Sequence, residues 1–328
     1  MARLPTPTAE TPDFLETMTL ISPRSSPRGA ALLAVLWLIA IIGLACMAAL
    51  RVISFDVDVA SAKIHGSRAR QIAEMGIAVG CNPAIKRTDP LLQMTDEKAG
   101  GRYEVRLTSE GGRFNINAIL LRSDKNLLSS IFNDWGLEQE DAQAVTDALI
   151  DWVDEDNNVS LTGAEKEQYK KAGRVNQPFN RPFYDINEVR LVRGMAMVEA
   201  IRPDWRSWFT VWSGGALDLN DAPAELIAAA AECPVEQAEI IPETVRGPDQ
   251  VRATPDDLPF ENPADALALL GIDVDGRPDL AQRFTVKDQT DRIESIGYAE
   301  GAKRKITVII RNRSGKPALL ERTEEIIP

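Results

Sequence analysis

Histidine is nearly absent from this sequence of 328 residues, and cysteine is rare. The one histidine, His65, excludes any site that needs two, such as the HExxH zinc motif, and argues against a histidine-based catalytic triad. The three cysteines, Cys46, Cys81 and Cys233, show no CxxC spacing, which argues against a zinc site. Cys81 and Cys233 either form a disulfide in an oxidising compartment or are two unrelated buried thiols, and their spacing leaves both readings open.

Basic residues are outnumbered by acidic ones, 37 to 49, and the formal net charge is −12. A nucleic-acid binder normally presents a basic face, so we expect no nucleic-acid partner. The sequence contains no GxSxG, Walker or GxGxxG pattern, and we expect no enzymatic activity. The acidic surface does offer carboxylates to hard cations such as calcium.

One apolar run decides the localisation. Residues 30–50 are 21 consecutive residues without a charge, Asn, Gln or Pro. As a helix they cover roughly 30 Å, the thickness of a bilayer core. Arg24 and Arg28 precede the run, so the positive-inside rule keeps the N-terminus cytoplasmic and exports everything after Arg51. We therefore expect a single-pass membrane protein with a large extracytoplasmic body.

The residues in front of the run are unlike a secretory signal peptide, which has a shorter apolar core and is cut after it. Arg28-Gly29 directly before a purely apolar helix resembles the prepilin-peptidase site of type IV pilins and pseudopilins. The resemblance implies a cut after Gly29 and a mature chain that begins at Ala30. The 29-residue leader is long for that family, so Met18 is an alternative start to Met1. The other interpretation is an ordinary signal anchor without processing.

Most pilins and pseudopilins carry a glutamate five residues after the cut, a costly residue in lipid unless it is paired. This sequence has Ala34 there. The K minor pseudopilin of type II secretion systems (the general secretion pathway protein K family) typically lacks that glutamate, and this chain resembles it over nearly all residues after 24. The absence suits a subunit at a filament tip.

Beyond the bilayer, the helix is expected to continue through residues 51–79, which contain no proline and keep apolar residues near helical spacing. Gly80, Asn82 and Pro83 then form a stop signal.

Strand signals come at both ends of the remaining chain, with helical patterns between them. Residues 102–108 alternate in strand fashion, and 113–119 are expected to pair with them across Gly111-Gly112. Residues 293–300 and 305–312 predict a closing hairpin around Glu300-Gly301.

The predicted fold class is therefore α+β: a pilin-like long N-terminal helix packed on a small antiparallel sheet, with a large α-helical (SAM-like) insertion, as the K pseudopilin resemblance implies. The expected parts are the leader 1–29, the transmembrane helix 30–50, the extracytoplasmic half of that helix 51–82, the first part of the sheet 83–122, a helical insertion with a calcium loop 123–205, a second helical unit 206–280 and closing strands 281–328.

The densest polar cluster lies at 151–169. Oxygen-bearing residues occupy positions 1, 3, 5, 7, 9 and 12 of a calcium loop, and they are Asp154, Asp156, Asn158, Ser160, Thr162 and Glu165. Val159 stands where an EF-hand has its invariant glycine, so a relative of that loop is expected, with Asp151 as a substitute ligand. The alternative is a solvated acidic loop. K pseudopilins share the Asp-Trp-x-Asp-x-Asp run and the following Gly-Ala-Glu, which implies structural calcium held by Asp151, Asp154, Asp156, Asn158 and Glu165.

Two further segments match the family and look structural. In 180–195, Asn187 or Asp185 is expected to cap a helix at 188–193, and the segment to tie the calcium loop to the helical domain. In 217–230, Asp221 or Asn220 is expected to cap a helix that has Pro223 in its first turn. Its exposed residues are expected to be acidic, which argues against phosphate binding; they are Asp221, Glu225, Glu232, Glu236 and Glu239.

The resemblance implies a tip subunit that starts pseudopilus assembly with the I, J and H minor pseudopilins. The other implied partners are prepilin peptidase, the inner-membrane assembly platform and secreted substrates. The expected location is the bacterial inner membrane, with the body periplasmic. The alternatives are a minor pilin of a type IV pilus or competence system and a membrane-anchored calcium-binding module.

Overall fold

The computed structural model describes residues 27–96, 100–122 and 124–328. The chain divides into two compact units, one ending at Ser61 and the other running from Ala62 to Pro328. Helix α1 (Pro27–Cys81) belongs to both. It ends where the glycine and proline signals predict.

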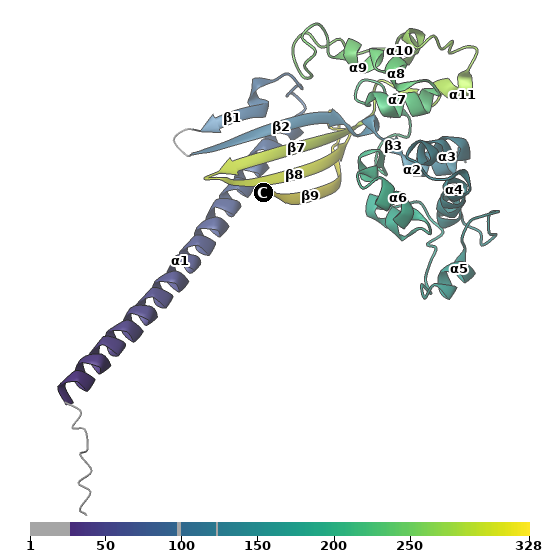
Figure 1. Ribbon diagram of the computed structural model, residues 1–328. Helices are drawn as coiled ribbons and strands as arrows, with labels where there is room; N and C mark the ends of the chain where they lie inside the picture. Colours follow the sequence, from purple (N-terminus) through teal and green to yellow (C-terminus); the bar gives the residue numbers. More distant parts are fainter. Residues whose placement is uncertain (1–26, 97–99, 123) are drawn as a thin grey trace, which may run out of the picture. The chain divides into compact units, whose positions relative to one another are not determined.

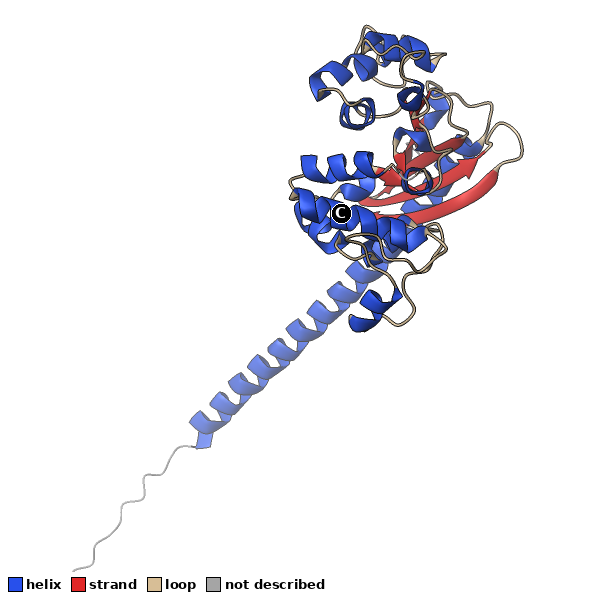
Figure 2. Ribbon diagram, turned by 90° about the vertical axis from the view of Figure 1, so that its right-hand side faces the viewer, coloured by secondary structure: helices blue, strands red, loops and turns tan. Residues whose placement is uncertain are grey.

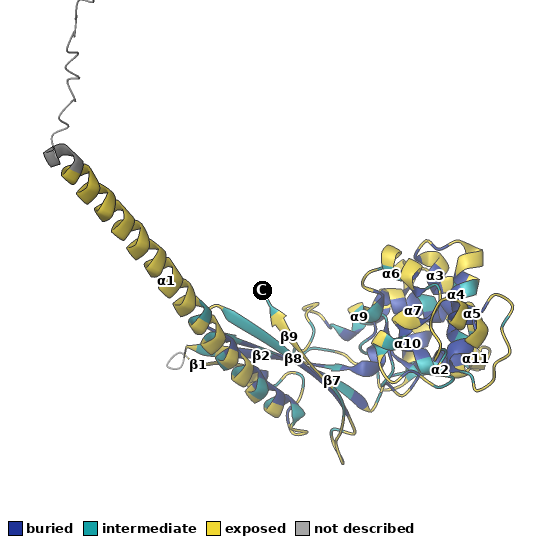
Figure 3. Ribbon diagram, turned by 90° about the horizontal axis from the view of Figure 1, so that it is seen from below, coloured by how far each residue is buried: buried dark blue, intermediate teal, exposed yellow. Residues whose placement is uncertain are grey.

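The first part of α1 is apolar on every side. Leu32, Trp37 and Ile41 are all more than half exposed, and none of the side chains in its most apolar window is buried by the protein (Figure 3). A helix of a soluble domain would bury one such stripe. By length and composition, α1 is the one helix among the described residues that could cross a membrane. This is compatible with a single-pass anchor.

The second unit is built on a five-stranded antiparallel sheet in the order β1-β2-β7-β8-β9 (Figure 1). Its strands are β1 (Gln93–Asp96), β2 (Gly101–Ser109), β7 (Thr290–Ala299), β8 (Ala302–Arg311) and β9 (Ala318–Ile327). Strand β2 pairs with β7 along its whole length, so the two ends of the body share one sheet, as predicted. The predicted closing hairpin is β7 and β8, and Glu300 and Gly301 take the positive φ of a tight turn.

The end of α1 packs on one face of this sheet. A compact apolar core forms there, with Ala73 and Ile77 from the helix and Val105, Ile293 and Ile306 from three strands. The alternation of β7, buried at every second residue from Ile293 to Ala299, directs one set of side chains to the helix. The predicted helix-on-sheet arrangement is confirmed.

Gly297 allows this packing to be close. A Cβ at that position would lie 2.1 Å from the Ala69 carbonyl oxygen and 2.5 Å from the Ala73 nitrogen, both on the α1 backbone. We expect Gly297→Ala to destabilise the chain by about 3 kcal/mol, because helix and strand must separate. Thermal unfolding of the full chain in detergent measures this. Gly315→Ala is the control, since the nearest atom to its Cβ is 3.9 Å away, and an equal loss there would contradict the prediction.

The chain between β2 and β7 forms the helical insertion (Figure 2). Its helices are α2 (Ile116–Leu121), α3 (Lys125–Asp134), α4 (Gln139–Val153), α5 (Lys166–Lys171), α6 (Met195–Ile201), α7 (Ala224–Ala231), α8 (Val235–Ala238), α9 (Ile240–Val245), α10 (Pro263–Leu269) and α11 (Pro278–Ala281). One large apolar core runs through it, and Trp152 and Trp205 are fully buried there. The expected helical insertion is confirmed.

The predicted strand at 113–119 is wrong. Only Phe114–Asn115 is extended, as β3, and it pairs in parallel with β4 (Phe209–Thr210). The Asn115 side chain then accepts a hydrogen bond from the Ala118 N–H and starts α2. Strand β2 therefore finds its partners in β1 and β7.

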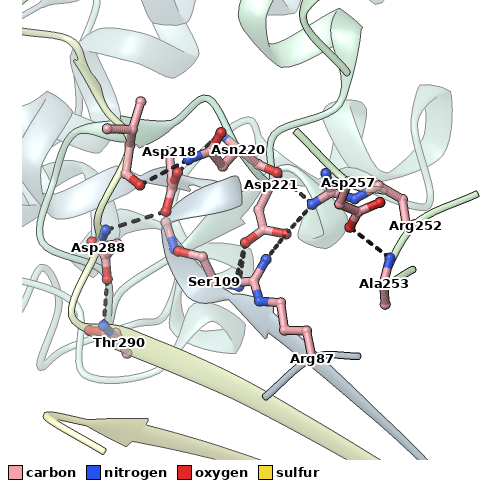
Figure 4. Close-up of polar contacts among 12 residues, drawn as sticks. Arg87, Ser109, Asp218, Asn220, Asp221, Arg252, Ala253, Asp257, Asp288 and Thr290 are labelled. Carbon is pink, nitrogen blue, oxygen red and sulfur yellow. Dashed lines mark hydrogen bonds and ion pairs between the residues drawn. The ribbon is translucent and has the colours of Figure 1, made fainter. Parts of the chain in front are cut away.

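A buried polar junction joins the insertion to the sheet (Figure 4). Asp221 follows β5 (Leu217–Asp218), which pairs in parallel with β6 (Phe284–Thr285). The Asp221 carboxylate forms ion pairs with Arg87 at 2.6 Å and with Arg252 at 3.1 Å. It also accepts a hydrogen bond from the Ser109 N–H at 2.8 Å.

The predicted roles of Asp221 and Asn220 are corrected by this geometry. The Asp221 side chain is 5% exposed, so it is no surface acid, and α7 has Pro223 at its N-cap without a side-chain cap. The side chain of Asn220 instead bonds the backbone of Phe260 and Val286. The partners of both residues lie far away in the sequence, and a capping rule considers only neighbouring residues.

Candidate metal centre

The predicted calcium loop connects α4 to α5. Three of the five predicted ligands come together there: Asp151 on the last turn of α4, Asp154 just after it, and Glu165 at the start of α5. One carboxylate oxygen from each lies within 4.8 Å of the others. Asp151 and Glu165 are buried, and Asp154 is half-buried. Carboxylates this close together repel one another when charged, and a bound cation would relieve that repulsion.

Asp151 organises the loop. Its carboxylate is fully buried and accepts the Ser160 N–H at 3.2 and 3.1 Å. A Cβ on Gly163 would lie 2.0 Å from Asp151 Oδ2, so only glycine fits there. The loop thus has its glycine at Gly163, four residues after the position that an EF-hand uses.

Two buried oxygens of the cluster, Asp154 Oδ1 and Glu165 Oε1, have no hydrogen-bond partner among the residues that the structure describes. Burial raises the pKa of Asp154 to about 6, and the charges of Asp156 and Asp151 add to it. Burial likewise raises the pKa of Glu165 to about 7. A buried carboxylate oxygen without a donor costs free energy unless something binds it, and hard cations bind oxygen ligands. The cluster therefore fits a hard cation such as calcium.

The other two predicted ligands lie outside this group. Asp156 and Asn158 are exposed, and Asp156 Oδ1 accepts the Asn158 N–H at 2.7 Å in a local turn. Their role as ligands stays a prediction.

Asp147, which the sequence reasoning missed, anchors the far side of the loop. Its carboxylate accepts the Thr162 N–H and hydroxyl at 3.1 and 2.9 Å and pairs with Lys125 at 2.9 Å. Thr162 is thereby drawn toward α4. Asp147 and Asp151 are four residues apart on one helix, hence on one face, and that spacing was the available signal.

The segment 180–195 braces the loop, as predicted. The predicted helix at 188–193 is instead a 3-10 helix at Ile186–Leu191, and the Asp185 side chain caps it. Downstream, Arg193 donates its N–H to the Tyr169 hydroxyl at 3.0 Å and its guanidinium to the Gly163 carbonyl at 3.3 Å. Trp152, next to Asp151, packs edge-on against Tyr169 at 5.4 Å.

The predicted processing residues lie at the start of α1, whose backbone includes Gly29 and Ala30. Of the expected leader, residues 1–26 lie outside the described residues. Cys81 and Cys233 are free thiols, which agrees with the alternative of two unrelated thiols, but both are half-buried rather than buried.

Comparisons with known proteins find similarity to protein K of type II secretion systems. The family model for protein K of the type II secretion system matches residues 112–204, which hold the carboxylate cluster. A type II secretion system protein K from Pseudomonas aeruginosa is 31% identical over 156 residues, covering 43% of this chain and 44% of the relative. The protein K from Klebsiella pneumoniae is 33% identical over 104 residues, 29% of this chain and 32% of the relative. The chain thus spans less than half the length of these relatives.

The fold has a solved counterpart. A chain in the crystal structure of the GspK-GspI-GspJ complex from the enterotoxigenic Escherichia coli type 2 secretion system superposes with a TM-score of 0.56. The match covers 83% of this chain and 98% of that one at 15% identity, so it establishes the shared fold.

Proposed function

We propose that this chain, whose residues 112–204 match the type II secretion system protein K family, is a minor pseudopilin of a type II secretion system. The observation that carries the proposal is the protein K domain inserted between β2 and β7 of a helix-on-sheet body. The apolar first part of α1 supplies the anchor of such a subunit. The role is structural rather than enzymatic.

Within that system the chain acts at the tip of the pseudopilus. The structural counterpart is part of a complex of GspK with GspI and GspJ, which supports I and J partners here. An insertion as long as the one between β2 and β7 leaves little room for a subunit stacked above it. Ala34 in place of the usual glutamate fits the same position. From the tip, the chain starts assembly with the I, J and H pseudopilins on the inner-membrane platform and supports export of folded proteins, contacting secreted substrates.

The chain is anchored in the inner membrane with a cytoplasmic N-terminus and a periplasmic body, after prepilin peptidase has cut between Gly29 and Ala30. The test is the N-terminal sequence and intact mass of the protein from membranes with and without that peptidase. A start at Ala30, seen only with the peptidase, is the expected result. An uncut chain would instead favour a signal anchor carrying a calcium-binding module.

Deletion of the chain separates the structural role from an enzymatic one. We expect loss of all secretion by the system, while the purified protein shows no hydrolase activity. Loss of a single secreted activity, with the other secreted proteins unaffected, would contradict the tip role.

The carboxylate cluster holds a structural calcium ion. Asp151, Asp154 and Glu165 are the ligands placed to receive it, and Asp156 and Asn158 complete the set if the loop closes on the ion. The unpartnered oxygens and the raised pKa values support this assignment. A bound cation would neutralise the cluster and fix α5 against α4.

Gly163→Ala tests the cradle of this site. The new methyl would occupy the place of Asp151 Oδ2, so we expect calcium affinity to fall about 10- to 100-fold. Isothermal titration calorimetry on the full chain measures the change, with Gly315→Ala as the control. Unchanged affinity in Gly163→Ala would remove Asp151 from the ligand set.

A further inference from the structure

A cavity of about 430 Å³ lies against α5, and its lining includes Ala164, the sequence neighbour of Glu165 in the carboxylate cluster. We name it the α5–α6 pocket. Its lining residues are Ala164, Gln168, Tyr169, Lys171, Ala172, Arg174, Arg190, Val192, Arg193, Gly194 and Ala196. Its size falls in the range of ligand pockets. Four of these residues are cationic and none is acidic, in a chain whose net charge is −12.

Most of the cations in this pocket are not paired with a carboxylate of the described residues. Within the part of the chain that the structure describes, Lys171, Arg174 and Arg193 form no ion pair, whereas Arg190 pairs with Glu199 at 3.0 Å. Arg174 and Arg193 are held by backbone carbonyls, those of Leu191 and Gly163. A neutral carbonyl orients a guanidinium and leaves its charge available to a ligand.

The floor of the pocket is apolar and fixed. Val192, Tyr169 and Ala164 are buried, and the Tyr169 hydroxyl accepts the Arg193 N–H, which joins the two walls. A ligand that fits must therefore combine negative charge with an aliphatic part. Arginine forks match carboxylates in a bidentate manner.

We propose that the α5–α6 pocket binds an acidic segment of a partner protein, with glutamate or aspartate side chains at Lys171, Arg174 and Arg193 and a neighbouring aliphatic side chain on Val192. Charge complementarity selects this occupant. The acidic remainder of the molecule repels long polyanions such as nucleic acids and anionic lipid surfaces, but it admits a short segment steered to one positive spot. The proposal does not depend on the membrane anchor or on the pseudopilin role.

The test is fluorescence anisotropy of a short labelled peptide that alternates glutamate and leucine, titrated with the full chain in neutral detergent and calcium-containing buffer. The matched variants are Lys171→Glu and Lys170→Glu. They change the net charge equally and are neighbours on α5, but only Lys171 lines the pocket. We expect Lys171→Glu to weaken binding about tenfold and Lys170→Glu to leave it within about twofold. A peptide with glutamine for glutamate is expected to bind about tenfold more weakly than the acidic one.

Equal weakening by both variants would reduce the effect to general electrostatics and overturn the proposal. Equal binding of the glutamine peptide would also overturn it, as would full displacement of the peptide by inorganic phosphate or by phosphatidylglycerol vesicles. If Lys171→Glu does not fold, Arg174→Gln provides the second measurement, with an expected loss of about threefold. No loss there would exclude the pocket.

Discussion

In the absence of calcium, the chain is expected to lose stability as the pH rises from about 4 to about 7. Burial raises the pKa of Glu165 from 4.5 to about 7, and that of Asp154 from 3.8 to about 6. In this pH window the folded protein binds more protons at these groups than the unfolded chain does, so the free energy of unfolding decreases with pH. For Glu165 alone the raised pKa corresponds to about 3 kcal/mol. Chemical denaturation across this pH range, in a chelator, measures the slope.

Calcium is expected to reverse this loss. Binding displaces the protons of Asp154 and Glu165, so calcium affinity rises with pH as these two groups ionise. At pH 8 a saturating concentration would restore the stability that ionisation removes, while at pH 4 it would add little. Identical pH profiles with calcium and with chelator would contradict the assignment of the site.

Glu165→Gln is the control that isolates the cluster from other acids. Paired carboxylates such as Asp147 and Glu294 have lowered pKa values, so they contribute the opposite slope at low pH. The amide introduced by this substitution keeps an acceptor for the Lys166 N–H and puts a donor where Glu165 Oε1 has no partner among the described residues. Without calcium we expect the variant to exceed the wild type by up to about 3 kcal/mol at pH 8 and to equal it near pH 4. It should not respond to calcium.

The sequence alone predicts an element correctly where the signal for that element is local. The apolar run, the stop at Gly80 and the alternation around Glu300-Gly301 each specify an element through periodicity and turn chemistry over a few residues. The pairing of the two ends of the body in one sheet followed from these signals. For the carboxylate cluster, loop spacing led to Asp154 and Glu165, and the Asp-Trp-x-Asp-x-Asp run shared with K pseudopilins led to Asp151.

The sequence alone does not predict the conformation of a residue whose interaction partner lies far away in the chain. Residues 113–119 alternate like a strand, but Asn115 caps α2 instead, and β2 pairs with β7, far away in the sequence. The position of Gly163 against Asp151 likewise depends on how the loop folds back on α4. Asp147 is a third case, since its bonds to Thr162 exist only after that return. Tertiary contacts override local propensity at all three places.

Asp221→Asn is expected to cost about 3 kcal/mol of stability, although Asp221 lies outside the carboxylate cluster of Asp151, Asp154 and Glu165. The wild-type carboxylate neutralises Arg87 and Arg252 and accepts the Ser109 N–H (Figure 4). Removing one partner of a buried charge cluster leaves the others desolvated and unpaired. The arginines are about one third exposed, at 36% and 32%, which places the cost at the lower end of the range for buried pairs.

Glu232→Gln is the matched comparison for this prediction. Glu232 also receives two arginines, Arg277 and Arg283, at 3.3 and 3.1 Å, but its side chain is 53% exposed. Arg283 keeps a second carboxylate, Asp124, at 3.0 Å. After the substitution, water solvates the arginine charges that Glu232 had paired with. We therefore expect the free energy of unfolding to fall by less than about 1 kcal/mol. Urea denaturation of both variants decides the matter: if the two losses are equal, burial of the Asp221 junction contributes nothing to holding the insertion on the sheet.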